Sequence, residues 1–149
     1  MYKRQDRHRA VARCDHRPVA VDLRADWATP LIAAGLAPDR PTAWLLEGLL
    51  IYLSAREATH LLTTMHELSA PGSRTAFEFE EIDAGTLREQ ADRLPVVAEY
   101  AALWHGGPTD APGWLARHGW RWAAHDATDL SARYGRAACS GGFVTATRA

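Results

Sequence analysis

The sequence lacks the features that indicate a membrane, secreted or nucleic-acid-binding protein. Its apolar stretches are too short to cross a bilayer, and no apolar segment near the start resembles a signal peptide. The two cysteines, Cys14 and Cys139, lie far apart and show neither disulfide nor metal-site spacing. A formal net charge of -1 provides no basic field that would attract nucleic acid. We therefore expect a cytoplasmic protein with no metal, no membrane contact and no nucleic-acid partner.

Length and composition indicate one folded domain or part of one. The 149 residues are 47% hydrophobic, which is enough to fill one ordinary core. Residues 1–17 are largely polar and charged, without periodicity, and we expect them to form a poorly ordered leader. The first five residues resemble the translated read-through of a transposon sequencing adapter, so an artefactual origin is one explanation for them. The folded part is expected to cover residues 18–149.

One apolar run, from Pro41 to Leu53, contains a single carboxylate, Glu47. A strand buried on both faces reads as a continuous apolar run. A lone Glu at the end of such a strand is better explained by a ligand or loop contact than by packing. Ser54 and Glu57 follow with the spacing of a capping box, which predicts a helix directly after the run. The expected local order is strand, acidic turn and helix.

The rest of the chain alternates between strand and helix patterns. Strands are predicted where β-branched, aromatic or alternating residues occur, and helices where apolar residues recur three and four apart. The predicted strands lie in residues 18–24, 41–53, 74–80, 120–126 and 142–148. The predicted helices lie in residues 26–35, 54–68, 83–94, 95–104, 112–119 and 129–134. This order predicts an α/β fold with an open sheet, in which the strand, helix and strand over residues 41–80 form a parallel crossover.

Two acidic residues stand at the carboxyl ends of predicted strands, Asp22 in the first and Glu47 in the second. In open α/β sheets, ligands bind outside the carboxyl ends of the strands, near the switch point in strand order. The coincidence of two carboxylates at such ends predicts a binding site there.

Four stretches closely resemble one family. They are Val21–Trp27, Gly35–Pro38, Pro41–Leu53 and Leu68–Arg74. Together they resemble bacterial S-adenosylmethionine-dependent methyltransferases related to leucine carboxyl methyltransferase, over about half the chain. The resemblance implies a Rossmann-like class I methyltransferase sheet, mostly parallel with an antiparallel terminal strand. The first two strands and the glycine-rich turn of that sheet have no counterpart before Val19, so we expect residues 18–149 to be the C-terminal part of such a domain.

The resemblance also implies a cofactor, S-adenosyl-L-methionine, and the residues that hold it. Asp22 would accept a hydrogen bond from the adenine amino group, while the Leu23 amide donates to the adjacent ring nitrogen. Glu47, with Gly48 beside it, would lie near the sulfonium and amino groups, where a carboxylate can pair with positive charge. Tyr52 is a candidate for the substrate side of the site.

Each of these roles has an alternative that needs no ligand. Asp22 would otherwise end its strand in a solvated turn, and Glu47 would pair with a core arginine or tryptophan. Tyr52 would be a core residue. His105 is a further substrate-side candidate, as a base for a hydroxyl acceptor, and is otherwise a surface or structural histidine. No catalytic residue is assigned, because methyl transfer from a sulfonium is a direct displacement that depends on alignment and desolvation.

Three functions are compatible with the sequence. The first is methyl transfer to the oxygen of a small carboxylate or hydroxyl compound, by an enzyme of which this chain is a fragment that is inactive alone. The second is a binding or interaction module without catalysis. The third is a nonfunctional truncated product with an exposed sheet edge. The sequence identifies neither the methyl acceptor nor the oligomeric state.

Overall fold

The computed structural model describes residues 13–79, 89, 100–137 and 141–149. The chain divides into two compact units, Met1–Leu36 and Ala37–Ala149, and each is described by itself. The predicted boundary after residue 17 stays a prediction. Within the described residues, no helix is both long and apolar enough to span a membrane.

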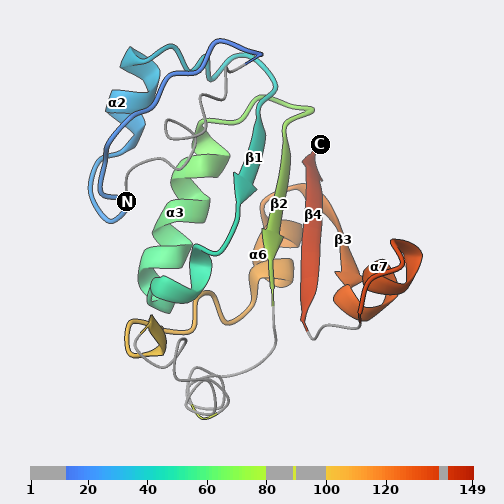
Figure 1. The fold of residues 1–149 in the computed structure, drawn as a ribbon. Coiled ribbons are helices and arrows are strands. Elements are labelled where there is room, and N and C mark those ends of the chain that lie inside the picture. The colour runs from blue at the N-terminus through green and yellow to red at the C-terminus, as the bar shows by residue number, and fades with distance from the viewer. Residues whose placement is uncertain (1–12, 80–88, 90–99, 138–140) are drawn as a thin grey trace. The chain divides into compact units, whose positions relative to one another are not determined.

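The first unit contains the short helix α2 (Ala28–Ala33; Figure 1). Its start is held by Asp26, whose carboxylate accepts the Thr29 amide at 3.1 Å, and Gly35 ends it at a φ of 107°. The helix predicted over residues 26–35 is thus confirmed. The strand predicted over residues 18–24 is wrong, since the described segment has no strand pairing and ends in a turn. A strand needs a neighbour for its backbone groups, and the described part of this unit supplies none.

The second unit is built on a sheet of four strands among its described residues, in the order β1-β2-β4-β3 (Figure 1). The strands are β1 (Ala43–Leu46), β2 (Arg74–Glu78), β3 (Trp120–Asp126) and β4 (Gly142–Arg148). β1 and β2 are parallel, whereas β4 is antiparallel to both β2 and β3. The α/β class, the parallel crossover and the antiparallel terminal strand are therefore confirmed. The sheet is mixed rather than mostly parallel, because the last two strands pair antiparallel with each other.

Helix α3 (Ala55–Glu67) makes the crossover between β1 and β2. Its capping box forms as predicted: the Ser54 hydroxyl accepts the Glu57 amide at 3.3 Å, and the Glu57 carboxylate accepts the Ser54 amide at 2.8 Å. The residues that face the core share one stripe of the helix, namely Ala58, Leu61, Leu62 and Met65. The helix predicted from Ser54 is confirmed, and its amphipathic stripe explains how it packs.

Two shorter helices follow in the C-terminal part, α6 (Ala111–Arg117) and α7 (Ala127–Arg133). Each begins at an aspartate cap: Asp110 accepts the Gly113 amide at 2.8 Å, and Asp126 accepts the Thr128 amide at 2.7 Å. The helices predicted over residues 112–119 and 129–134 are thus confirmed with shifted ends. Apart from residue 89, the predicted helix over 83–94 lies outside the described residues, as does most of that predicted over 95–104.

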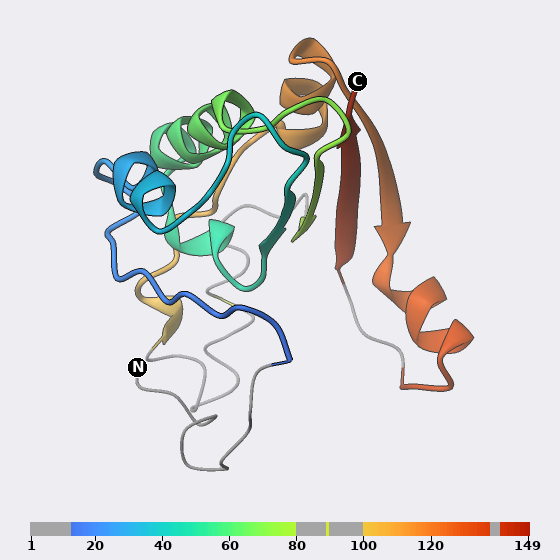
Figure 2. The same cartoon turned by 90° about the horizontal axis from the view of Figure 1, so that it is seen from above.

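Helices α3 and α6 lie on the same side of the sheet (Figure 2), and the side chains beneath them form the core. Phe77 and Val144 are each 1% exposed, and the Trp44 indole donates to the Ser69 hydroxyl at 2.8 Å. On the opposite side, Leu45 is 72% exposed. The prediction that the strand of the apolar run is buried on both faces is therefore wrong, because the described helices cover one face of the sheet.

A hydrogen bond ties the end of α3 to the start of β3. The Trp120 indole donates to His66 Nδ1 at 3.1 Å, and Trp120 is 3% exposed. As an acceptor, His66 must be neutral with its proton on Nε2. Burial holds the pKa of His66 below its usual range, with smaller contributions from the charges of Arg148 and His118 that outweigh the opposing effect of Glu67. The packing of α3 on β3 is thus linked to the protonation of one histidine.

We expect acid to destabilise the protein through His66. Because its folded-state pKa is lowered, the neutral imidazole contributes stability above the unfolded-state value of 6.5. This contribution is lost as the pH falls through the folded-state pKa. In His66→Asn, an amide oxygen keeps an acceptor that cannot be protonated, so its unfolding free energy in urea should fall less between about pH 8 and pH 5. Equal pH dependence in both proteins would contradict this.

Candidate functional site

The acidic turn lies directly after β1, at the carboxyl end of the strand. Leu46 is the last strand residue, Glu47 is exposed, and Gly48 adopts a left-handed φ of 58°. The chain then forms the short 3-10 helix η1 (Leu50–Tyr52), in which Leu50 is 5% exposed. The strand predicted to run through the apolar stretch therefore ends at Leu46, because the apolar residues beyond the turn pack as a helical turn. Glu47 stands at a strand end, as expected.

Glu78, which is not among the site residues predicted from the sequence, contacts the same turn from the neighbouring strand. It is the last residue of β2, and its Oε2 accepts a hydrogen bond from the Gly48 amide. The last pair of the parallel register is Leu46 with Phe77, so Glu47 follows β1 where Glu78 ends β2. Two unit charges about 5 Å apart, which is the backbone spacing of neighbouring strands, would repel by about 1 kcal/mol or less in water. In a parallel crossover the two strands end at the same edge of the sheet, and this is the signal in the sequence that points to Glu78.

Tyr52 and His105 come from two segments that run beside each other. The His105 amide donates to the Ile51 carbonyl at 2.8 Å, and the Gly107 amide donates to the Leu53 carbonyl at 2.9 Å. Tyr52 is 38% exposed and His105 is exposed, so both side chains are reachable from solvent. The structure thus places the segment that carries His105 beside the segment that follows Glu47 and carries Tyr52.

Asp22 and Leu23 lie in the first unit, where Asp22 is held in an exposed turn. The Arg24 guanidinium donates to both Asp22 oxygens, at 3.0 and 2.7 Å, and the Arg24 amide donates to Oδ1 at 3.0 Å. These bonds, the side-chain ones first, lower the pKa of Asp22 to about 2. Asp22 therefore sits in a solvated turn with a local ion pair. Since it lies in a different unit from Glu47, a crevice formed by both stays a prediction.

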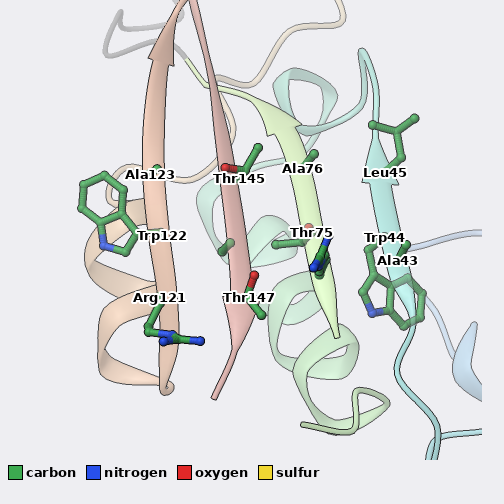
Figure 3. Close-up of a pocket in the computed structure, with 12 residues that line it drawn as sticks. Ala43, Trp44, Leu45, Thr75, Ala76, Arg121, Trp122, Ala123, Thr145 and Thr147 are labelled. Atoms are coloured by element: carbon green, nitrogen blue, oxygen red, sulfur yellow. The ribbon is translucent and has the colours of Figure 1, made fainter. Parts of the chain in front are cut away.

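A separate hollow of about 590 Å³ lies on the sheet face away from α3 and α6 (Figure 3). Figure 3 shows one row of its lining, Leu45, Ala76, Thr145 and Ala123, crossing all four strands. None of the predicted site residues lines this hollow. Among the residues that the structure describes, no group of three His, Cys, Asp or Glu side chains could hold a metal ion.

Part of the sequence matches a known protein family. Residues 3–66 match the model of the leucine carboxyl methyltransferase family. These residues include Asp22, Leu23, Glu47, Gly48 and Tyr52. The family resemblance predicted from the sequence is confirmed by this match.

Individual relatives extend the similarity over almost the whole chain. A "putative S-adenosyl-L-methionine-dependent methyltransferase" of Parafrankia sp. is 45% identical over 143 residues, covering 92% of this chain and 46% of the relative. Proteins with the same description from Frankia alni and Mycolicibacterium paratuberculosis are 44% and 43% identical, covering 96% and 87% of this chain. These matches cover 52% and 44% of the two relatives. The chain therefore spans about half the length of the curated relatives that it matches.

Two glycines in this region should respond differently to alanine. Both have positive φ, 58° at Gly48 and 73° at Gly107, which costs an L-residue about 1–2 kcal/mol. A Cβ at Gly48 would meet nothing within 4 Å, whereas one at Gly107 would lie 2.9 Å from the Leu50 carbonyl oxygen. Gly107→Ala should therefore lower the unfolding free energy in urea by more than Gly48→Ala does. An equal or smaller effect at Gly107 would show that the Leu50 carbonyl does not constrain this segment.

Proposed function

We propose that this chain is part of an S-adenosyl-L-methionine-dependent methyltransferase that methylates an oxygen of a small carboxylate or hydroxyl compound. The observation that carries the proposal is the 45% identity over 92% of the chain to the Parafrankia protein, whose name states this cofactor. The leucine carboxyl methyltransferase match over residues 3–66 supports an oxygen acceptor. We also propose that the 149 residues alone do not turn over substrate, because the chain spans only about half the length of the relatives that it matches.

The adenine end of the cofactor fits the turn at Asp22. With a pKa of about 2, this carboxylate is ionised at neutral pH and acts only as an acceptor. A carboxylate offers about four lone-pair sites, and Arg24 occupies three of them, which leaves one for the adenine amino group. The Leu23 amide has no acceptor among the residues that the structure describes, so it is available to the ring nitrogen. This donor and acceptor order matches the edge of adenine.

The positive end of the cofactor fits the turn at Glu47. Within the described residues Glu47 forms no ion pair, and it is exposed at the carboxyl end of a parallel strand. A sulfonium and an amino group both carry positive charge, which a free carboxylate can stabilise. The neighbouring Glu78 adds to the negative potential at this edge of the sheet.

The methyl acceptor would approach from the side of Tyr52 and His105. In a direct displacement, the protein aligns the acceptor oxygen with the methyl group and excludes water. A carboxylate acceptor needs no base, whereas a hydroxyl acceptor would have to lose a proton, for which we propose His105 as the candidate base. An aromatic side chain such as Tyr52, 38% exposed, can provide apolar surface to a small acceptor.

Calorimetry with S-adenosylhomocysteine tests the cofactor assignment. It should be run on the 149-residue chain and on the chain extended by its upstream coding sequence. We expect the extended protein to bind and to transfer a labelled methyl group to small carboxylates or hydroxyls, and the shorter chain to show weaker binding and no turnover. An extended protein that is folded but does not bind would overturn the proposal.

Variants of the two proposed contacts sharpen this experiment. Asp22→Ala and Glu47→Gln should each weaken binding by roughly tenfold, which is the effect of losing one charge-assisted hydrogen bond of about 1.4 kcal/mol. Asp15→Ala is the matched control, because Asp15 also forms an exposed ion pair with an arginine two residues later, Arg17. Equal binding by Asp22→Ala and Asp15→Ala would remove Asp22 from the site.

A further inference from the structure

The turn that carries Glu47 depends on a contact from outside its own sequence. Gly48 has a φ of 58°, and a Cβ there would meet nothing within 4 Å. The left-handed backbone conformation, and not a lack of space, therefore favours glycine at this position. The Gly48 amide donates to Glu78, which lies 30 residues further along the chain. Backbone amides in an exposed turn ordinarily bond to water. Here the amide is held by a charged acceptor, which makes a stronger bond than a neutral one.

Glu78 is itself fixed by the sheet on which it stands. Its backbone pairs with Phe143 of β4, and the next residue, Phe79, donates to the Gly142 carbonyl at 3.0 Å. The preceding residue, Phe77, is 1% exposed and pairs with strands on both sides. Because the backbone of Glu78 is held in the sheet, its side chain can position the turn more rigidly than a side chain on a loop could.

The position of Glu78 has an electrostatic cost that needs a reason. Both Glu78 and Glu47 are exposed and stand at adjacent strand ends, where like charges disfavour each other. The bond to Gly48 directs one Glu78 oxygen towards the turn. Among the described residues Glu47 forms no ion pair.

We infer that Glu78 is a positioning residue for the candidate cofactor site. Its carboxylate holds the Gly48 amide, and this fixes the left-handed turn so that Glu47 is presented at the carboxyl end of β1. The inference rests on the proposed function for the identity of the ligand, a sulfonium cofactor. The hydrogen bond that carries it is independent of that function.

Nuclear magnetic resonance of glycine-labelled protein tests the positioning directly. In Glu78→Ala, the Gly48 amide should lose its bond, its proton resonance should shift, and its order parameter should fall from about 0.85 towards 0.6 or below. Glu78→Gln keeps an acceptor oxygen and should restore most of the order. Asp39→Asn, a change at another exposed carboxylate of the same unit, should leave Gly48 unaltered. A Gly48 resonance and order parameter that are the same in Glu78→Ala as in the unaltered protein would overturn the inference.

Binding of S-adenosylhomocysteine to the same variants, in the extended protein, connects the turn with the site. We expect Glu78→Ala to weaken binding about tenfold and Glu78→Gln to weaken it less. A mobile Gly48 with unchanged affinity would show that the turn does not serve the cofactor, which also overturns the inference. If the unaltered extended protein does not bind, the proposed function fails, while the Gly48 measurement still decides whether Glu78 holds the turn.

Discussion

The parallel pairing of β1 with β2 is the constraint on which the rest of the second unit depends. Two parallel strands cannot be joined by a tight turn, so the chain must cross the sheet between them, and α3 makes that crossing. Because parallel strands end at the same edge, the crossover also places the residues that follow each strand next to one another. Glu47 and Glu78 are neighbours for this reason, although 30 residues separate Gly48 from Glu78.

The end of α3 is fastened to three strands by polar contacts. Trp44 of β1 donates to Ser69, Trp120 of β3 donates to His66, and Arg148 of β4 donates to the carbonyls of His66 and Ser69. The last carbonyls of a helix have no partner within the helix, and the arginine supplies one while its charge suits the negative end of the helix dipole. The same contacts bind the strands to one helix, so the parallel and antiparallel parts of the sheet share one core.

Local signals in the sequence were sufficient for most elements of this unit. The capping box at Ser54 and the spacing of Leu61 and Met65 indicated α3, and the strands predicted over residues 120–126 and 142–148 have the bounds that the structure shows for β3 and β4. Such signals depend on a few neighbouring residues and can therefore be recognised from the sequence alone. The strand predicted near Asp22 failed because strand formation depends on a pairing partner, which local composition cannot supply.

The candidate site could be predicted only where it follows from strand ends. Glu47 was conspicuous because a charge interrupts an apolar run, and the structure places it at the end of β1. Glu78 was not conspicuous, because a charge at the end of an alternating strand looks like an ordinary solvated residue. Its role appears only when the register is known, since the register decides which side chain reaches the Gly48 amide.

The strand-end turn is a better candidate site than the larger hollow on the sheet face. The hollow is lined by all four strands, and its lining includes small side chains such as Ala43, Ala76 and Ala123. A site that recognises a cationic ligand needs acceptors that converge on one point. Glu47 and Glu78 stand at adjacent strand ends, whereas the charged residues that line the hollow, Arg74 and Arg121, are both cationic. The hollow offers the larger volume, but the acidic side chains at the strand ends are better suited to a cationic ligand than the two arginines of the hollow.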